Sequence, residues 1–208
     1  MSITSTRPPA SVAPWAEIVP DAGPMTMADY LAYPDSDGYR YELVDGVLVR
    51  MAGTRPEAGD ATRALLFPLA AYVQAQGLGV VTLPDEVYDF ERTGQPNTGL
   101  LPDVGFYYAS RAAQVTPHEP RPFAPDLAAE VAGGSQRQAD MDAKARRYVR
   151  GGTALVWVVW PERRQVDVWH RDDRAPVATL GDGDTLDGLD VVPGFTLPVA
   201  SVFAGPLA

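Results

Sequence analysis

The sequence predicts an α/β (α+β) fold in which a central mixed β-sheet is flanked by helices. An Asp-Gly pair at 45–46 between two apolar-rich runs is a strong signal for a β-hairpin. Residues 126–132, 137–150 and 155–159 read as strand, helix and strand, and such a βαβ unit makes its two strands parallel. Residues 166–169 follow a short turn, so we expect them to return antiparallel. Parallel and antiparallel neighbours together make the sheet mixed.

The beginning of the chain predicts a flexible N-terminal arm followed by one domain. Residues 1–24 are rich in Pro, Ser, Thr and Ala, which is typical of a disordered or loosely attached segment. Residues 25–208 are long enough for a single domain with its own core. At its start, Thr26 is placed to cap a short helix over 27–31, which Pro34 ends.

A long helix and two strands are expected after the hairpin. The helix is predicted over 57–76 with Gly77 as its C-cap, and Pro68 predicts a kink or a later helix start. Strands are expected around 79–90 and 103–109. One face of the helix carries the apolar residues Ala61, Leu65, Leu69, Tyr72 and Val73.

The second half of the chain completes the sheet. Residues 155–159 are a continuous apolar run, typical of a strand that is covered on both faces. Residues 166–169 alternate apolar and polar side chains, which favours a half-exposed strand. The remaining residues, 177–203, predict short strands and turns that end in one helical turn at 199–203.

Composition restricts the function classes. The chain has no cysteine, which excludes disulfides, thiolate metal sites and cysteine nucleophiles, and fits a reducing cytoplasm. It has no long apolar run and no signal-peptide pattern, so we expect a cytoplasmic protein without a membrane span. The formal net charge of -10 opposes steering of the whole molecule toward nucleic acid.

Three polar residues break the local patterns. Glu130 lies inside an otherwise apolar strand, where a carboxylate is costly unless it is paired or bound to a cation. Asp103 opens the strand before it. Lys144 lies on the inward stripe of the helix that follows Glu130, at helical spacing from Met141 and Tyr148. A lysine on such a stripe indicates a partner carboxylate or phosphate.

These residues suit metal-dependent phosphodiester hydrolysis. The strand with Glu130 leads directly into the helix with Lys144, and such junctions border the crevice where α/β proteins bind ligands. Mg²⁺ prefers carboxylate oxygens, keeps several waters and contacts phosphate oxygens. The ion lowers the pKa of a bound water, and a lysine can orient that water or stabilise the transition state. Two carboxylates and an ammonium that converge there suit this chemistry.

Five stretches of the chain carry a resemblance to a known family: YELVDG at 41–46, LPDV at 101–104, AAEV at 128–131, the helix segment 144–148 and LVWVVWP at 155–161. In their order and spacing they resemble the Uma-two family of restriction endonuclease-like proteins in the PD-(D/E)XK nuclease superfamily. The resemblance covers roughly residues 25–203. It implies a restriction-endonuclease-like core around the mixed sheet.

The resemblance also implies the site and its partners. Asp103 and Glu130 match the family's metal ligands, and Glu42 matches an upstream glutamate that completes the metal site. Lys144 matches a catalytic lysine that has moved from the strand to the helix. The implied cofactor is Mg²⁺ or Mn²⁺, and the implied substrate is DNA. A homodimer is expected, because two strands need two sites.

Departures from the family pattern leave two functions open. Gly133 stands where the family has serine, Gln136 and Trp160 stand where it has aspartate, and Ala58 or Gly59 stands where it often has histidine. The first function is an Mg²⁺-dependent endonuclease. The second is a catalytically inactive domain that keeps the nuclease fold as an interaction or scaffold protein, which the acidic charge favours.

Each candidate residue also has a purely structural interpretation. Asp103 suits a turn or strand start, and Glu130 suits an edge strand with one solvated face. Lys144 can extend its charge to solvent with its stem on the core, and Glu42 can be exposed beside the Asp-Gly turn. Three further residues are candidates for phosphate contacts or for supporting the site: Gln138, Arg137 and Tyr148.

Overall fold

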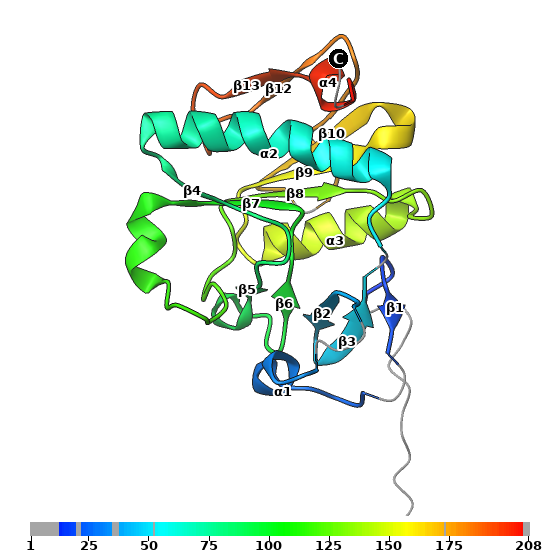
Figure 1. The fold of residues 1–208 in the computed structure, drawn as a ribbon, viewed down its shortest axis with the longest axis vertical. Helices are drawn as coiled ribbons and strands as arrows, with labels where there is room; N and C mark the ends of the chain where they lie inside the picture. Colours follow the sequence, from blue (N-terminus) through cyan, green and yellow to red (C-terminus); the bar gives the residue numbers. More distant parts are fainter. Residues whose placement is uncertain (1–12, 20–21, 35–37, 52, 173, 206–208) are drawn as a thin grey trace, which may run out of the picture.

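Two larger β-sheets, a two-stranded sheet of β12 (Thr185–Asp187) and β13 (Thr196–Pro198), and two long helices build the described part of the fold (Figure 1). The computed structural model describes residues 13–19, 22–34, 38–51, 53–172 and 174–205. The larger sheet has six strands in the order β11-β10-β9-β8-β7-β4. Its strands are β4 (Gly79–Thr82), β7 (Val104–Tyr108), β8 (Leu127–Val131), β9 (Leu155–Trp160), β10 (Gln165–His170) and β11 (Ala178–Leu180).

The larger sheet is mixed, as the sequence predicts. β8 and β9 pair in parallel, and the other neighbouring pairs are antiparallel. The parallel pair is joined by α3 (Gln138–Arg150), so the predicted βαβ unit is confirmed. The fold class predicted from the sequence is therefore confirmed.

The smaller sheet has the order β1-β3-β2-β6-β5. The predicted hairpin is confirmed, since β2 and β3 pair around Asp45 and Gly46, both at positive φ (50° and 77°). Positive φ at both turn residues is the type I′ geometry that Asp-Gly favours. The strands are β1 (Glu17–Ile18), β2 (Tyr41–Val44), β3 (Val47–Arg50), β5 (Tyr88–Asp89) and β6 (Gly99–Leu100).

Helices cover both faces of the larger sheet (Figure 1). The long α2 (Pro56–Gln76) packs on one face with the C-terminal segment, and α3 packs on the other together with the smaller sheet. The short α1 (Met27–Leu31) begins at a capping box in which Thr26 and Asp29 exchange hydrogen bonds, as the sequence predicts. The remaining elements are β12 (Thr185–Asp187), β13 (Thr196–Pro198), α4 (Val199–Val202) and the 3-10 turns Glu91–Thr93, Ala109–Gln114 and Pro161–Arg163.

Three sequence expectations need correction. Pro68 does not delay the start of α2, because the helix already begins at Pro56. A proline is tolerated at the first helical position, since the N–H of that position has no partner within the helix. The strand expected over 79–90 is two strands in different sheets, since the chain turns at Asp85 with φ 76°. β10 is not half-exposed, because its polar Asp167 is buried and accepts bonds from Trp160 and Thr179.

Part of the segment that was expected to be a flexible arm packs against the domain. Residues 1–12 and 20–21 lie outside the described residues. Within 13–19, however, Ala13 and Trp15 are buried and β1 pairs with β3. Ala13 and Trp15 pack into the core cluster that includes residues of the smaller sheet and α3, and Ile18 packs against the same cluster.

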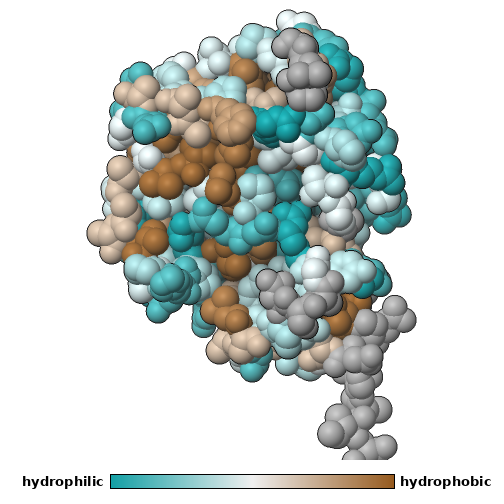
Figure 2. All heavy atoms as spheres, in the orientation of Figure 1, coloured by the Kyte–Doolittle hydropathy of each residue, from teal (hydrophilic) through white to brown (hydrophobic). Residues whose placement is uncertain are grey.

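Hydrophobic surface remains on the side where α2 and β4 lie (Figure 2). Exposed apolar side chains there include Phe67, Val80 and Leu83. No helix among the described residues is long and apolar enough to cross a membrane.

Candidate functional site

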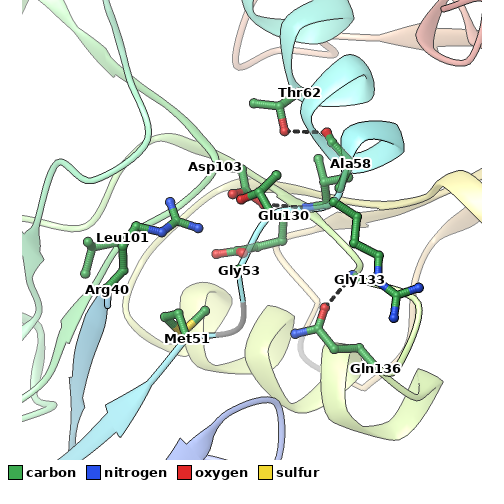
Figure 3. A pocket seen from close by; sticks show the side chains of 13 residues that line it. Arg40, Met51, Gly53, Ala58, Thr62, Leu101, Asp103, Glu130, Gly133 and Gln136 are labelled. Atoms are coloured by element: carbon green, nitrogen blue, oxygen red, sulfur yellow. Dashed lines mark hydrogen bonds between the residues drawn. The ribbon is translucent and has the colours of Figure 1, made fainter. Parts of the chain in front are cut away.

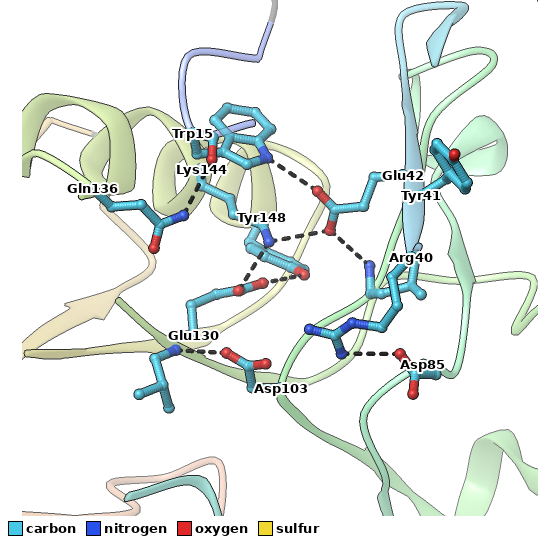
Figure 4. Close-up of polar contacts among 12 residues, drawn as sticks. Trp15, Arg40, Tyr41, Glu42, Asp85, Asp103, Glu130, Gln136, Lys144 and Tyr148 are labelled. Carbon is cyan, nitrogen blue, oxygen red and sulfur yellow. Dashed lines mark hydrogen bonds and ion pairs between the residues drawn. The ribbon is translucent and has the colours of Figure 1, made fainter. Parts of the chain in front are cut away.

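Glu42 is fixed by the hairpin at the centre of the smaller sheet. It lies opposite Val49 in the β2–β3 register and is fully buried. The Trp15 Nε1–H donates to Glu42 Oε2 over 3.0 Å, and the Leu101 N–H donates to Oε1 over 2.9 Å (Figure 4). Lys144 Nζ lies 3.1 Å from the same Oε1. Both carboxylate oxygens of Glu42 are therefore occupied by groups of the protein.

Lys144 joins the two sheets through an ion pair on each side. It projects from α3, and its side chain is only 1% exposed. Besides Glu42, its Nζ donates to Glu130 Oε2 over 2.9 Å. Burial alone would lower the pKa of Lys144, but the Glu130 and Glu42 carboxylates outweigh that effect and raise it. Lys144 is therefore held as an ammonium ion.

Glu130 is positioned by two residues of α3. Tyr148 follows Lys144 by one helical turn, so both side chains lie on the same face of the helix. The Tyr148 hydroxyl donates to Glu130 Oε1 over 2.7 Å, while Lys144 holds Oε2. Burial raises the pKa of Glu130 above that of an ordinary glutamate, and Lys144 opposes the shift.

Asp103 lies next to Glu130 because their strands are neighbours. It stands just before β7, and its Oδ2 accepts a 2.8 Å bond from the backbone N–H of Val131 on β8. Burial raises the pKa of Asp103, and this hydrogen bond acts against the rise. Asp103 and Glu130 thus lie side by side at one end of the β7–β8 pair, and the Glu130 carboxyl is turned toward Lys144 and Tyr148 (Figure 4).

The two carboxyls line a small cavity of about 50 Å³ (Figure 3). By the same measure a single water needs about 10–15 Å³, so the cavity has room for a few water-sized ligands. Its walls include Arg40, Arg55 and Gln136. Glu42 and Lys144 are not among its lining residues.

The donor set fits a hard divalent cation held by two carboxylates. Among the described residues, no group of three or more Asp, Glu, His or Cys side chains is arranged to hold a metal ion. Mg²⁺ is commonly held by only one or two carboxylates, with waters and substrate phosphates filling its remaining positions. Asp103 and Glu130 match that pattern, whereas Glu42 faces Lys144.

The charges of the site support the same interpretation. Glu42, Asp103 and Glu130 contribute three carboxyls, and Lys144 contributes one buried ammonium. Arg40 and Arg55 border the cavity, and the Arg40 Nη1 pairs with Asp85 over 2.9 Å, which leaves fewer free cations than buried carboxyls. Buried carboxylates without enough positive charge are costly, so a cation in the cavity would stabilise this arrangement.

Two of the expected supporting residues lie elsewhere. Gln138 does not line the cavity, and its Nε2 donates to Asp142 on α3 and to Asp167 on β10. Arg137 is a largely exposed residue that pairs with Asp140 in the first turn of the helix. Neither Gln138 nor Arg137 is among the residues that line the cavity. Tyr148, in contrast, contacts Glu130 directly.

Three residues that the sequence reasoning missed also belong to this region. Trp15, in the expected arm, anchors Glu42. Arg40 is only two residues before Glu42, and this spacing in the sequence could have indicated a cation beside the candidate carboxylates. Gln136 accepts from the Gly133 N–H over 2.7 Å and donates to the Trp15 carbonyl over 3.2 Å. Gln136 therefore ties the turn after β8 to the N-terminal segment.

Comparisons with known proteins agree with this architecture. A solved structure from Anabaena variabilis, described as "a putative nuclease belonging to DUF820", superposes with a TM-score of 0.71 at 15% sequence identity. The match covers 87% of this chain and 98% of the other. At that identity the likeness shows the fold. A search of curated proteins gives no match.

The family is established by a sequence profile. The profile of Uma2, described as "Putative restriction endonuclease", matches residues 27–200, which is most of the chain. The matched range contains Glu42, Asp103, Glu130 and Lys144. The resemblance found in the sequence is therefore confirmed, and the chain belongs to the Uma2 family.

Proposed function

We propose that this protein is an Mg²⁺- or Mn²⁺-dependent endonuclease that hydrolyses DNA phosphodiester bonds. One observation supports this above the others: Asp103 and Glu130 line the same small cavity, and Lys144 and Tyr148 hold the Glu130 carboxyl in place. The descriptions of the family and of the structural neighbour point to the same class of enzyme.

Each residue then has a distinct task. Asp103 and Glu130 would hold the cation, which when bound supplies an activated water and neutralises charge on the phosphate. In hydrolysis, the water oxygen bonds to phosphorus, the bond to one sugar oxygen breaks, and that oxygen takes a proton. Lys144 is already protonated and buried, so it cannot accept the proton of the water. We assign it as a positioning residue that orients Glu130.

Arginines at the cavity would contact the substrate. Arg40 and Arg55 both line it, and a guanidinium can bind phosphate through two parallel hydrogen bonds. Arg55 has no ion-pair partner within the described part of the chain. A phosphate between these arginines and the two carboxyls would place its phosphorus beside the cation site.

Plasmid cleavage with Mg²⁺ or Mn²⁺ tests the proposal. Wild type should cut, while Asp103→Asn and Glu130→Gln, which keep side-chain size and remove one charge, should lose at least about 100-fold in rate. Asp126→Asn is the matched control, because Asp126 is a buried carboxyl paired with Arg111 and lies outside the cavity. Equal cutting by all four proteins would identify a contaminating nuclease and refute the assignment.

A second candidate function is an inactive scaffold domain. The net charge of -10 and the replacement of the family's aspartate by Gln136, which serves a structural bond, favour it. Calorimetry with Mg²⁺, Mn²⁺ and Ca²⁺ separates the two, because a scaffold need bind none of them at millimolar concentration.

We also propose a homodimer for the cutting of duplex DNA. Two copies of the chain would supply one site for each strand. Light scattering after size exclusion gives the molar mass, and a monomer at working concentration would contradict this proposal.

A further inference from the structure

A second cavity, lined by tyrosines, adjoins the carboxylate cavity. Its volume is about 400 Å³, within the range of about 300–1,000 Å³ typical of small-molecule sites. Arg40 and Leu101 line both cavities, so the two are neighbours. The tyrosine cavity is formed by α1, the start of β2 and the turn that contains Asp85. Its aromatic side chains are Tyr30, Tyr33, Tyr39 and Tyr41.

The tyrosine rings are held in fixed positions. The Tyr30 hydroxyl donates to the Tyr41 carbonyl over 2.8 Å. The ring of Tyr33 meets that of Tyr41 edge-on at 5.2 Å. The guanidinium of Arg50 lies 4.3 Å from the centre of the Tyr39 ring, whose side chain is nevertheless exposed. Rigid rings at a surface cavity suit a flat aromatic ligand, because little side-chain entropy is lost on binding.

Arg40 links this cavity to the candidate metal centre. It stands two residues before Glu42, and its guanidinium is fixed by Asp85. A phosphate bound by Arg40 at the carboxylate cavity would leave the attached base within reach of the tyrosines. The arrangement therefore offers a charged site for a phosphate and an adjoining aromatic site for a base.

The electrostatics favour stacking over a broad phosphate contact. Binding of duplex DNA draws on many lysine and arginine contacts to phosphates, but this chain carries a net charge of -10. Near the cavity, Arg40 already pairs with Asp85 and Arg50 pairs with Glu17. Stacking of a base on an aromatic ring contributes without any net charge, and it requires the base to be unpaired.

We infer that the tyrosine cavity is a subsite for an unpaired nucleobase next to the phosphate that is cut. The inference rests on the proposed nuclease function and narrows its substrate class to nucleic acid with a single-stranded or splayed segment at the cleavage site. Both DNA and RNA carry such bases, so the shared ligand is the unpaired base itself.

The test measures binding in EDTA, where no cleavage can occur. Fluorescence anisotropy is recorded with a labelled oligo-dT, an oligo-U and a duplex of the same length. At least one of the two single-stranded probes should bind more tightly than the duplex. The difference in affinity between oligo-dT and oligo-U shows whether the subsite prefers DNA or RNA. Tyr39→Ala and Tyr33→Ala should each weaken that binding about 5- to 150-fold, the equivalent of about 1–3 kcal/mol of stacking.

Two controls make the outcome decisive. Tyr39→Phe keeps the ring and should keep wild-type affinity. Phe67→Ala removes an exposed ring from α2, outside both cavities, and should leave binding unchanged. Circular dichroism spectra and melting temperatures verify that each variant is folded.

The inference is overturned if both tyrosine-to-alanine variants bind like wild type, if Phe67→Ala weakens binding as much, or if the duplex binds at least as tightly as both single strands. The nuclease proposal is tested separately, by plasmid cleavage with Mg²⁺ or Mn²⁺. Its failure can therefore be told apart from a failure of the base-binding inference, which is tested in EDTA.

Discussion

Replacing Lys144 by methionine tests the central electrostatic feature of the fold. The methionine keeps much of the length of the lysine stem but removes the ammonium that contacts Glu42 and Glu130 at 3.1 and 2.9 Å. Both carboxyls would remain buried, with exposures of 0% and 4%. Removing one partner of a buried ion pair typically costs about 3–5 kcal/mol. We expect a loss in this range near pH 8.

The expected cost is not larger because other donors remain. Glu42 keeps its bonds from Trp15 and the Leu101 N–H, and Glu130 keeps its bond from Tyr148. The expected loss of stability is nevertheless a large fraction of the total stability of a domain, which is about 5–15 kcal/mol. Urea unfolding followed by circular dichroism measures the difference between the variant and wild type.

The loss should depend on pH with a defined sign. In wild type, burial raises the pKa of Glu130 and Lys144 lowers it. When Lys144 is removed, the pKa of Glu130 in the folded state should rise further above the ordinary value of 4.5. A group with a raised folded pKa contributes stability below its unfolded pKa and loses it as the pH rises. The destabilisation of Lys144→Met should therefore be smaller near pH 5 than near pH 8.

A second substitution isolates the pair. Glu130→Gln in the Lys144→Met background removes the unpaired charge and should recover part of the lost stability. The reasoning is refuted if Lys144→Met unfolds within about 1 kcal/mol of wild type near pH 8, as expected for a solvated surface lysine. It is also refuted if adding Glu130→Gln lowers stability further.

Three other perturbations have expected outcomes. Trp15→Phe removes the indole N–H from Glu42 and should cost about 1.5–3 kcal/mol, the range for a bond to a charged group, in urea unfolding; no change would show the N-terminal contact to be dispensable. Gly105→Ala would place a Cβ in steric overlap with Thr82 Oγ1 and should cost about 1–3 kcal/mol, measured as a lower melting temperature. Burial raises the pKa of Tyr88 above its ordinary value of 10.0, so wild type should lose stability as the pH rises above about 10. Tyr88→Phe should lack that part of the loss, and identical alkaline unfolding curves would contradict this prediction.

Much of the fold could be predicted from the sequence because local patterns and tertiary contacts agree. The Asp-Gly turn, the capping box at Thr26 and the βαβ unit each rest on interactions within a short stretch of chain. The buried stripe of α3, with Lys144 and Tyr148 one turn apart, follows from helical periodicity alone. Glu130 stood out because a carboxylate rarely occupies an apolar strand without a partner.

The sequence expectations were wrong where contacts between distant segments decide the outcome. Trp15 lies in a stretch of arm-like composition, yet it is buried by residues far along the chain, among them Glu42. Asp167 alternates like a solvent-facing residue, but Trp160 and Thr179 satisfy its carboxyl in the interior. Gln138 lies on the helix after Glu130, but its place around the helix axis turns it toward β10.

By itself, the sequence determined most of the elements, the mixed sheet and the unusual charges at Asp103, Glu130 and Lys144, because these depend on periodicity and on the cost of burying polar groups. Only the tertiary structure decided which charges meet. It placed Asp103 and Glu130 at one cavity, set Glu42 against Lys144, and put four tyrosines beside Arg40. The physical reason is that such distances depend on the register and packing of strands far apart in the chain, which no local pattern encodes.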